Sequence, residues 1–236
     1  MTAPCARVVS LVPSITEALA TVAGGRLVGA TDWCTHPRDL AVTRVRGTKN
    51  PDLAAIRALD PDLVVVTKEE NRELDVRRLR ESGVRVHVTE ISTVPEAVEV
   101  FEDLFDDVLG WERPDWLGTA RERWCGPLPP VTATVAIAIW RDPWMVVGGD
   151  TFTSDLARRL GWANAFADVA RYPAVELAAL DRDDLDLVVL PDEPYVFGPD
   201  DGPEAFTRVP TRLVEGRLLT WYGPSLLDAA SLADPA

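Results

Sequence analysis

The chain has few of the residues on which nucleophilic and metal-dependent chemistry usually relies. It contains 3 cysteines and 2 histidines among 236 residues. An odd number of widely spaced cysteines fits a reducing compartment better than a disulfide framework. Neither a phosphate-binding P-loop nor a strand-turn-helix G-x-G-x-x-G motif occurs. We therefore expect no catalytic residues and no resident cofactor.

Positive charge is also scarce, with 24 Lys and Arg against 38 Asp and Glu and a net charge of -14. Nucleic acids and anionic membrane surfaces require clustered cations, so neither is an expected partner. No apolar run reaches the roughly 18–20 residues that a membrane-spanning helix needs. The first residues lead directly into an expected strand at 8–11, which leaves no room for a signal peptide. We expect a cytoplasmic protein, or a periplasmic or cell-surface one if an upstream start adds a signal sequence.

An internal repeat is the most informative feature of the sequence. Residues 53–69 align without a gap with residues 177–193. Each copy has a short amphipathic helix, a turn with two aspartates, and a run of branched aliphatic residues. Such a run is typical of a parallel strand that is buried on both faces. Each copy then ends in a polar loop, Lys68-Glu69-Glu70-Asn71 in the first and Asp192-Glu193-Pro194-Tyr195 in the second.

The repeat predicts an α/β fold with two Rossmann-like lobes, each built on a parallel sheet. Hydrophobic residues make up 47% of the chain, which is enough for two cores of ordinary domain size. We expect lobes at residues 1–92 and 127–236, joined by a helical linker at 93–126. Further expected elements are strands at 27–29, 84–88, 135–139 and 217–221 and helices at 94–109, 115–125 and 153–160. Open α/β sheets bind ligands beyond their strand carboxyl ends, so the arrangement predicts a ligand cleft between the lobes.

Aromatic residues gather in the loops that follow the expected strands. They are Trp33, Trp140, Trp144, Trp221 and Tyr222. Together they would suit a large planar or macrocyclic ligand, although two or three of them would equally well pack the edges of the lobes. Lys49, Lys68 and Arg141 occupy the same loops and suit carboxylate, amide or phosphate groups. For Lys68, which precedes Glu69 and Glu70, a solvated ion pair is an equal alternative.

Signals for catalysis or metal binding are weaker. Cys34 and His36 are candidate metal ligands, or a nucleophile with its base, but their spacing is not that of a zinc site. His87 falls inside an expected strand and is interpreted as structural. Gly148-Gly149-Asp150-Thr151 is a weak candidate for an anion-binding nest at a helix start. The aspartates at 181, 183, 184 and 186 precede a buried strand and fit a turn better than a metal site.

Three stretches of the sequence resemble the class III substrate-binding proteins of ABC importers, the helical-backbone receptors for cobalamin, haem and iron-siderophores. These stretches are residues 7–17, 28–37 and 58–65. The resemblance covers nearly the whole chain and is closest to the cobalamin-binding branch. It implies two α/β lobes on a helical backbone, with the ligand held between the lobes. With the loop residues above, the candidate ligand-binding set is Pro13, Trp33, Lys49, Lys68, Trp140, Arg141, Trp144, Tyr195, Trp221 and Tyr222.

One departure from that family concerns its membrane partner. The resemblance implies a glutamate on the repeated helix of each lobe that docks onto permease arginines. Ala54 and Ala178 occupy those positions here, and Glu176 is the carboxylate nearest to the second one. The sequence thus predicts a non-catalytic binding protein for a large chelate such as cobalamin, haem or an iron-siderophore, without permease docking.

Two alternatives remain open at the level of sequence. One is a cytoplasmic chelatase-like enzyme acting on a tetrapyrrole or metal chelate, with His36 and one of Glu69, Glu70 or Glu193 in the active site. The other is an interaction or sensor module, which would need an exposed apolar patch.

Overall fold

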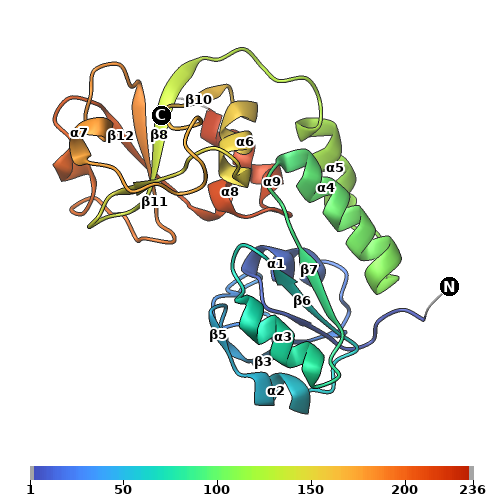
Figure 1. The fold of residues 1–236 in the computed structure, drawn as a ribbon. Coiled ribbons are helices and arrows are strands. Elements are labelled where there is room, and N and C mark those ends of the chain that lie inside the picture. Colours follow the sequence, from blue (N-terminus) through green and yellow to red (C-terminus); the bar gives the residue numbers. More distant parts are fainter. Residues whose placement is uncertain (1–2, 234–236) are drawn as a thin grey trace. The chain divides into compact units, whose positions relative to one another are not determined.

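The computed structural model describes residues 3–233 and divides them into two compact units (Figure 1). The first unit contains residues 3–90 together with Ala97–Thr119, and the second contains Ile91–Glu96 together with residues 120–233. The helical segment expected at 93–126 is therefore shared between the two units. Both units are built on parallel sheets, which confirms the predicted two-lobe α/β class.

The first unit has a five-stranded parallel sheet in the order β3-β2-β1-β6-β7. Its strands are β1 (Val8–Ser10), β2 (Leu27–Ala30), β3 (Thr43–Arg44), β6 (Leu63–Thr67) and β7 (Val86–Thr89), and a small antiparallel pair is formed by β4 (Arg46–Gly47) and β5 (Asn50–Pro51). The helices before the linker segment are α1 (Pro13–Ala20), α2 (Leu53–Ala58) and α3 (Glu73–Glu81).

The core of this sheet follows from its branched aliphatic strands. All five residues of β6 are buried. Val64 and Val66 pack in one cluster with Ile56 of α2 and Leu79 of α3. Fully burying one such side chain contributes about 1.5–3 kcal/mol, so a strand buried on both faces is stable only when it is aliphatic throughout.

The second unit has a parallel sheet in the order β10-β8-β11-β12, and β9 pairs antiparallel with β8. The strands are β8 (Ala133–Trp140), β9 (Met145–Val146), β10 (Trp162–Asn164), β11 (Leu187–Pro191) and β12 (Thr211–Val214). The helices are α6 (Phe152–Arg159), α7 (Leu177–Leu180), α8 (Arg217–Thr220) and α9 (Leu226–Ala229), with 3-10 segments η2 (Pro203–Ala205) and η3 (Ala230–Ala233).

The prediction of a strand at 217–221 is wrong. Residues Arg217–Thr220 form α8, in which the Gly216 carbonyl accepts from the amides of Leu219 and Thr220. The fourth strand is β12 instead, which pairs in parallel with β11 from Val188 to Pro191. Trp221 thus follows a helix rather than a strand.

The repeat extends beyond the aligned segment to the topology of both sheets. The order β2-β1-β6-β7 in the first unit corresponds to β10-β8-β11-β12 in the second. An aspartate at the equivalent position in each copy makes the same pair of hydrogen bonds. Asp62 donates its amide to the Arg7 carbonyl and accepts the Arg7 amide at Oδ2, both at 2.8 Å. Asp186 does the same with Thr134, at 2.9 and 2.6 Å. Asp62 thereby connects the start of β6 to the start of β1, and Asp186 connects the start of β11 to the start of β8.

The helices at 94–124 are α4 (Val94–Asp103), the π-helical η1 (Leu104–Leu109) and α5 (Asp115–Trp124), close to the predicted bounds. Phe101 contacts Trp116 edge-to-face at 5.2 Å, and the Trp116 indole donates to the Thr21 hydroxyl. These contacts join much of the segment to the first unit. Among residues 3–233, the structure contains no helix long and apolar enough to cross a membrane.

Candidate functional site

The topology of each sheet points to one place for a ligand. The chain runs from its first strand to a neighbour on one side and then returns to the other side, so the order reverses between β1 and β6 and again between β8 and β11. Open parallel sheets bind ligands outside the strand carboxyl ends at such a switch point. The loops after β8 and β11 form this place in the second unit.

Aromatic residues from these two loops pack together there. Trp140, the last residue of β8, contacts Tyr195 edge-to-face at 5.4 Å. Tyr195 contacts Phe197 at 4.7 Å, and Phe197 stacks on Trp144 at 5.8 Å. Trp140 is 43% exposed, whereas Trp144 is only 8% exposed. We call Trp140 and Tyr195, with the layer of Phe197 and Trp144 behind them, the aromatic face.

Charged groups surround the aromatic face but are already paired with one another. The Arg141 guanidinium donates to Asp201 and lies 2.5 Å from the Glu204 carboxylate. The Tyr195 hydroxyl donates to Asp201 Oδ2 at 2.7 Å. The hydrogen bond to Glu204 is the main cause that raises the pKa of Arg141, while the Tyr195 hydroxyl and then Arg141 lower the pKa of Asp201. Asp201 and Glu204 carry no sequence signal that links them to Arg141, because they lie about 60 residues from it along the chain.

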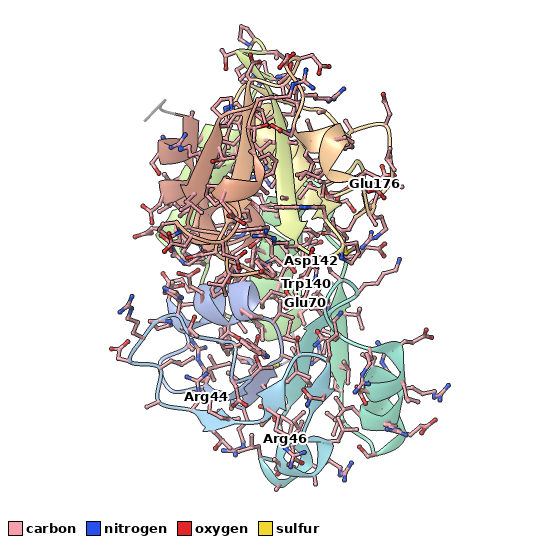
Figure 2. All side chains as sticks on the ribbon, turned by 90° about the vertical axis from the view of Figure 1, so that its left-hand side faces the viewer. Arg44, Arg46, Glu70, Trp140, Asp142 and Glu176 are labelled. Atoms are coloured by element: carbon pink, nitrogen blue, oxygen red, sulfur yellow. The ribbon has the colours of Figure 1, made fainter. Side chains whose placement is uncertain are left out.

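The loop between β8 and β9 has a strained backbone. Asp142 has a φ of 60° and Asp150, just beyond β9, has a φ of 55°. This left-handed region is uncommon for residues other than glycine, and such strain tends to collect at functional sites. Asp142 is exposed and lies close to Trp140 (Figure 2). Arg46, Asp60 and Arg171 also have positive φ values, so this conformation does not by itself mark a functional site.

The first unit holds its own candidates in the loops after its strands. Trp33 is 66% exposed. Its indole lies close to Gly47, where an added Cβ would be 3.1 Å from Trp33 Nε1. Lys49 donates to the Glu69 carbonyl, and Lys68 forms an exposed ion pair with Glu90 at 2.5 Å. Trp33 is thus the exposed aromatic of this set, while Lys68 matches the ion-pair alternative.

Asn71 was not singled out from sequence, yet it organises the same loops. Its amide nitrogen donates to the carbonyls of Leu11 and Thr48, and its Oδ1 accepts the Thr67 amide at 2.9 Å. Pro13, the first residue of α1, is buried just beyond this point. One side chain thereby connects the ends of β1 and β6 with the β4–β5 turn.

Three predicted ligand-binding aromatics of the second unit are buried. Trp144, Trp221 and Tyr222 are 8%, 8% and 5% exposed. Tyr222 contacts Phe152 edge-to-face at 5.4 Å. Glu193, at the end of β11, accepts from the Thr220 hydroxyl at 3.0 Å, and burial is the main cause that raises its pKa. This burial fits the alternative in which some of the aromatics pack the edges of the lobes.

The structure gives Cys34 a packing role. Its side chain is fully buried, and its Sγ lies 3.1 Å from the hydroxyls of Thr16 and Thr31. Burial raises the pKa of this thiol, which keeps it protonated. His36 Nδ1 lies 3.1 Å from the Thr35 hydroxyl. Within residues 3–233, no group of three His, Cys, Asp or Glu side chains is arranged to hold a metal ion.

Three weaker sequence signals also have structural explanations. His87 lies in β7, and burial followed by Arg85 lowers its pKa. The amides of Gly148 and Gly149, a weak candidate for an anion nest, instead donate to the carbonyls of Arg171 and Val169. Asp181 accepts three backbone amides, from residues 207–209, which lower its pKa to about 2 although partial burial opposes them. The aspartate run is therefore a turn, as predicted.

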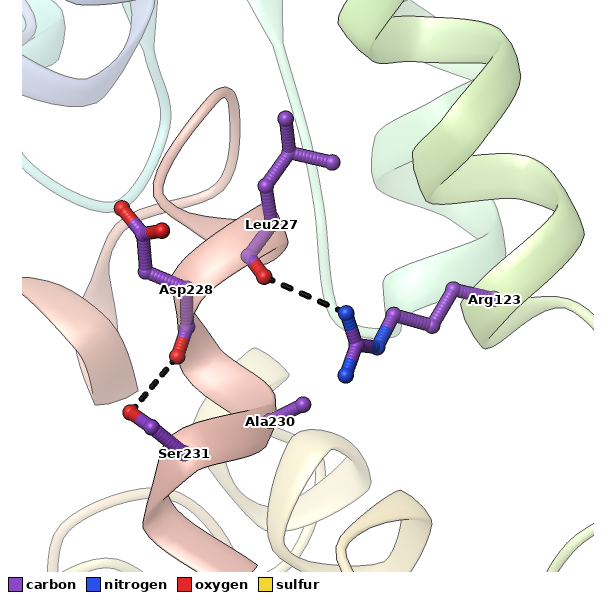
Figure 3. Close-up of a pocket in the computed structure, with 5 residues that line it drawn as sticks. All are labelled: Arg123, Leu227, Asp228, Ala230 and Ser231. Carbon is purple, nitrogen blue, oxygen red and sulfur yellow. Dashed lines mark hydrogen bonds between the residues drawn. The ribbon is translucent and has the colours of Figure 1, made fainter.

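An open pocket lies elsewhere in the second unit (Figure 3). It is lined by Arg123, Leu227, Asp228, Ala230 and Ser231. Arg123 donates to the Leu227 carbonyl at 3.4 Å, and the Ser231 hydroxyl donates to the Asp228 carbonyl at 2.7 Å. This pocket has no aromatic lining and includes none of the predicted ligand-binding residues.

Similarity to solved structures shows the fold class of the chain. No protein-family model matches the chain. The fold matches the periplasmic vitamin B12-binding protein of Vibrio cholerae with a TM-score of 0.74 at 20% identity, covering 98% of this chain and 95% of that one. It matches a periplasmic haem-binding protein of Pseudomonas aeruginosa with a TM-score of 0.81 at 21% identity, covering 97% and 91%. The chain therefore has a periplasmic-binding-protein fold.

Two curated relatives are similar to the chain in sequence. A vitamin B12-binding protein of Vibrio cholerae serotype O1 is 28% identical over 103 residues, which span 43% of this chain and only 37% of that relative. One from Vibrio parahaemolyticus is 25% identical over 184 residues, or 74% of this chain and 66% of the relative. The chain is thus similar in sequence to vitamin B12-binding proteins over part of its length, and it shares their fold.

Proposed function

We propose that this protein binds a large metal chelate without transforming it, and that a corrinoid such as cobalamin is its first candidate ligand. The observation that carries this proposal is the aromatic face. Trp140 is 43% exposed, is held in place by Tyr195, and stands at the switch point of a parallel sheet. A rigid, amphipathic aromatic at such a point gives contact area at little cost in side-chain entropy.

The first unit supplies a second surface of the same kind. Trp33 is 66% exposed in the loop that follows β2. A ligand that contacts the carboxyl-end loops of either sheet would cover one of these indoles, and a macrocycle is large enough to use such a surface. The relatives named above support the class of ligand, because they are named for binding vitamin B12 or haem.

Direct titration tests the proposal. The purified protein would be titrated with cyanocobalamin, haem and a ferric siderophore, with tryptophan fluorescence and calorimetry as independent measurements. We expect quenching and a heat signal with at least one chelate. Leu128→Ala, which changes a 48% exposed residue outside the candidate loops, is the control and should bind as the unchanged protein does. Unchanged fluorescence and silent calorimetry with all three ligands at high micromolar concentration would refute the proposal.

A chelatase assay tests the absence of chemistry. Porphyrin or corrin would be supplied with cobalt, nickel or iron, and we expect no metal insertion. The fully buried Cys34 and the lack of a metal-ligating group within residues 3–233 give no support to catalysis. Turnover that disappears in His36→Ala would instead establish the enzyme.

The proposal includes the absence of permease docking through the repeated helices. Ala54 on α2 and Ala178 on α7 are both exposed, and neither can form a charge-assisted pair. Asp52 caps α2 through the amides of Ala54 and Ala55, so its carboxylate is already used. Glu176, before α7, is exposed (Figure 2).

A further inference from the structure

We infer that the binding site of the second unit selects neutral or cationic chelates and discriminates against polyanionic ones. This inference rests on the proposed function, because it specifies the ligand of the same aromatic face. It depends on the charges that surround Trp140 and Tyr195, the two aromatics that line its outer side.

Arg141 is the cation next to the aromatic face, and two carboxylates hold it. It donates to Asp201 and lies 2.5 Å from Glu204. The Arg141 side chain is only 24% exposed, whereas those of Asp201 and Glu204 are 48% and 45% exposed. An incoming anion therefore meets the carboxylates more readily than the guanidinium. It would also have to displace one of them, which costs a charge-assisted pair.

Most of the remaining charged residues of these loops are acidic, and the one further cation, Arg208, pairs with Asp183. Asp142 and Asp192 follow β8 and β11 and are both exposed. With Asp201 and Glu204 they outnumber Arg141, so the local charge around the aromatic face is negative. A negative local potential raises the concentration of cations and lowers that of anions.

Tyr195 adds a second reason to expect discrimination against haem. Tyrosine is one of the side chains that hold haem iron. The Tyr195 hydroxyl donates to Asp201 Oδ2 at 2.7 Å, and this hydrogen bond is the main cause that raises its pKa. A phenol that is held protonated against a carboxylate is a poor iron ligand. Haem would therefore gain neither propionate pairing from Arg141 nor iron coordination from Tyr195.

The test compares two ligands of equal size and different charge. Cyanocobalamin is uncharged overall, and a monocarboxylate derivative, in which one side-chain amide is hydrolysed, carries one negative charge at neutral pH. Like charges about 4 Å apart in water repel by about 1 kcal/mol, so we expect roughly fivefold weaker binding of the carboxylate at low salt. The difference should shrink in about 1 M salt, where screening acts over about 3 Å.

A double variant identifies the groups responsible. Asp201→Asn with Glu204→Gln releases Arg141, and the preference should disappear or reverse; Glu204→Gln alone should shift it in the same direction if the double variant does not fold. Glu81→Gln removes a paired carboxylate on α3 and should keep the full preference. Equal or tighter carboxylate binding by the unchanged protein, or an unaltered preference in folded variants, would overturn the inference. If neither corrinoid binds while haem, an anionic chelate, does, the inference is overturned; if none of cyanocobalamin, haem and the ferric siderophore binds, the proposed function itself fails.

Discussion

Replacing Trp140 with alanine should weaken ligand binding and leave the fold largely intact. Trp140 is 43% exposed at the end of β8, and its main ring contact is the edge-to-face one with Tyr195. Truncation therefore removes surface that a ligand would cover, while little of the core is lost. Trp144 offers the opposite case four residues away in the same cluster, since it is 8% exposed and packs against Phe197 and Phe206.

The exposed area sets the magnitude of the effect. A tryptophan side chain buries up to about 250 Å² when fully covered, so at 43% exposure about 100 Å² of Trp140 remains for a ligand. At about 25 cal/mol per Å² this area is worth at most about 2.5 kcal/mol, or roughly 70-fold in Kd. The same reasoning gives at most about 4 kcal/mol for Trp33 at 66% exposure and about 0.5 kcal/mol for Trp144 at 8%.

Calorimetric titration and urea unfolding together test this ordering. Trp140→Ala should weaken binding and change the free energy of unfolding by less than about 1 kcal/mol. Trp144→Phe should leave binding nearly unchanged but destabilise the fold by about 1–3 kcal/mol, because it opens space in a packed cluster. If Trp144→Phe weakened binding more than Trp140→Ala, exposure would not be what selects ligand-contacting aromatics, and the reasoning would be wrong.

Three further predictions follow from other contacts. Burial raises the pKa of Glu193 above its ordinary 4.5 despite hydrogen bonds from Thr220 and Trp221. The contribution of protonated Glu193 to folding stability is therefore complete below about pH 4.5 and is lost as the pH rises through the folded pKa. The stability advantage of Glu193→Gln over the unchanged protein should grow from acid to neutral pH, and a constant difference in urea unfolding would contradict this. Cys5 and Cys34 are buried and Cys125 is partly exposed, so a thiol reagent should label Cys125 first in the native protein and reach the other two only on unfolding, as mass spectrometry would show. Ala54 and Ala178 should prevent stable binding to a vitamin B12 importer permease, and the double variant Ala54→Glu with Ala178→Glu should bind it more strongly. A salt-resistant complex between the permease and the unchanged chain would disprove this. Fractionation of the host cell would test the predicted cytoplasmic location.

The fold was largely predictable, because its signals are local. The aliphatic run at 63–66 and its copy at 187–190 can satisfy their burial only as central strands, and the two aspartate turns recur at a fixed offset. The failure at 217–221 has a physical reason. Arg217-Leu218-Leu219-Thr220-Trp221 is apolar enough for a strand, but the edge beside β11 is occupied by β12.

The candidate site was less predictable, because its properties depend on distant partners. Trp140 and Trp144 are four residues apart in equivalent sequence surroundings, yet one is exposed and the other is covered by Phe197 and Phe206. The state of Arg141 depends on Asp201 and Glu204, which belong to the long connection between β11 and β12. Sequence spacing contains no information on such contacts.

The division of the chain into two units determines where it can be separated into fragments. The first unit is discontinuous, and residues 97–119 belong to it although Ile91–Glu96 do not. A fragment that stops at residue 92 would lose Phe101, Phe105 and Trp116, which are at most 7% exposed in the intact protein. Such a fragment would expose their partner surface and tend to aggregate. A fragment ending after Thr119 would keep those partners, so half-proteins for reassembly experiments should be separated there.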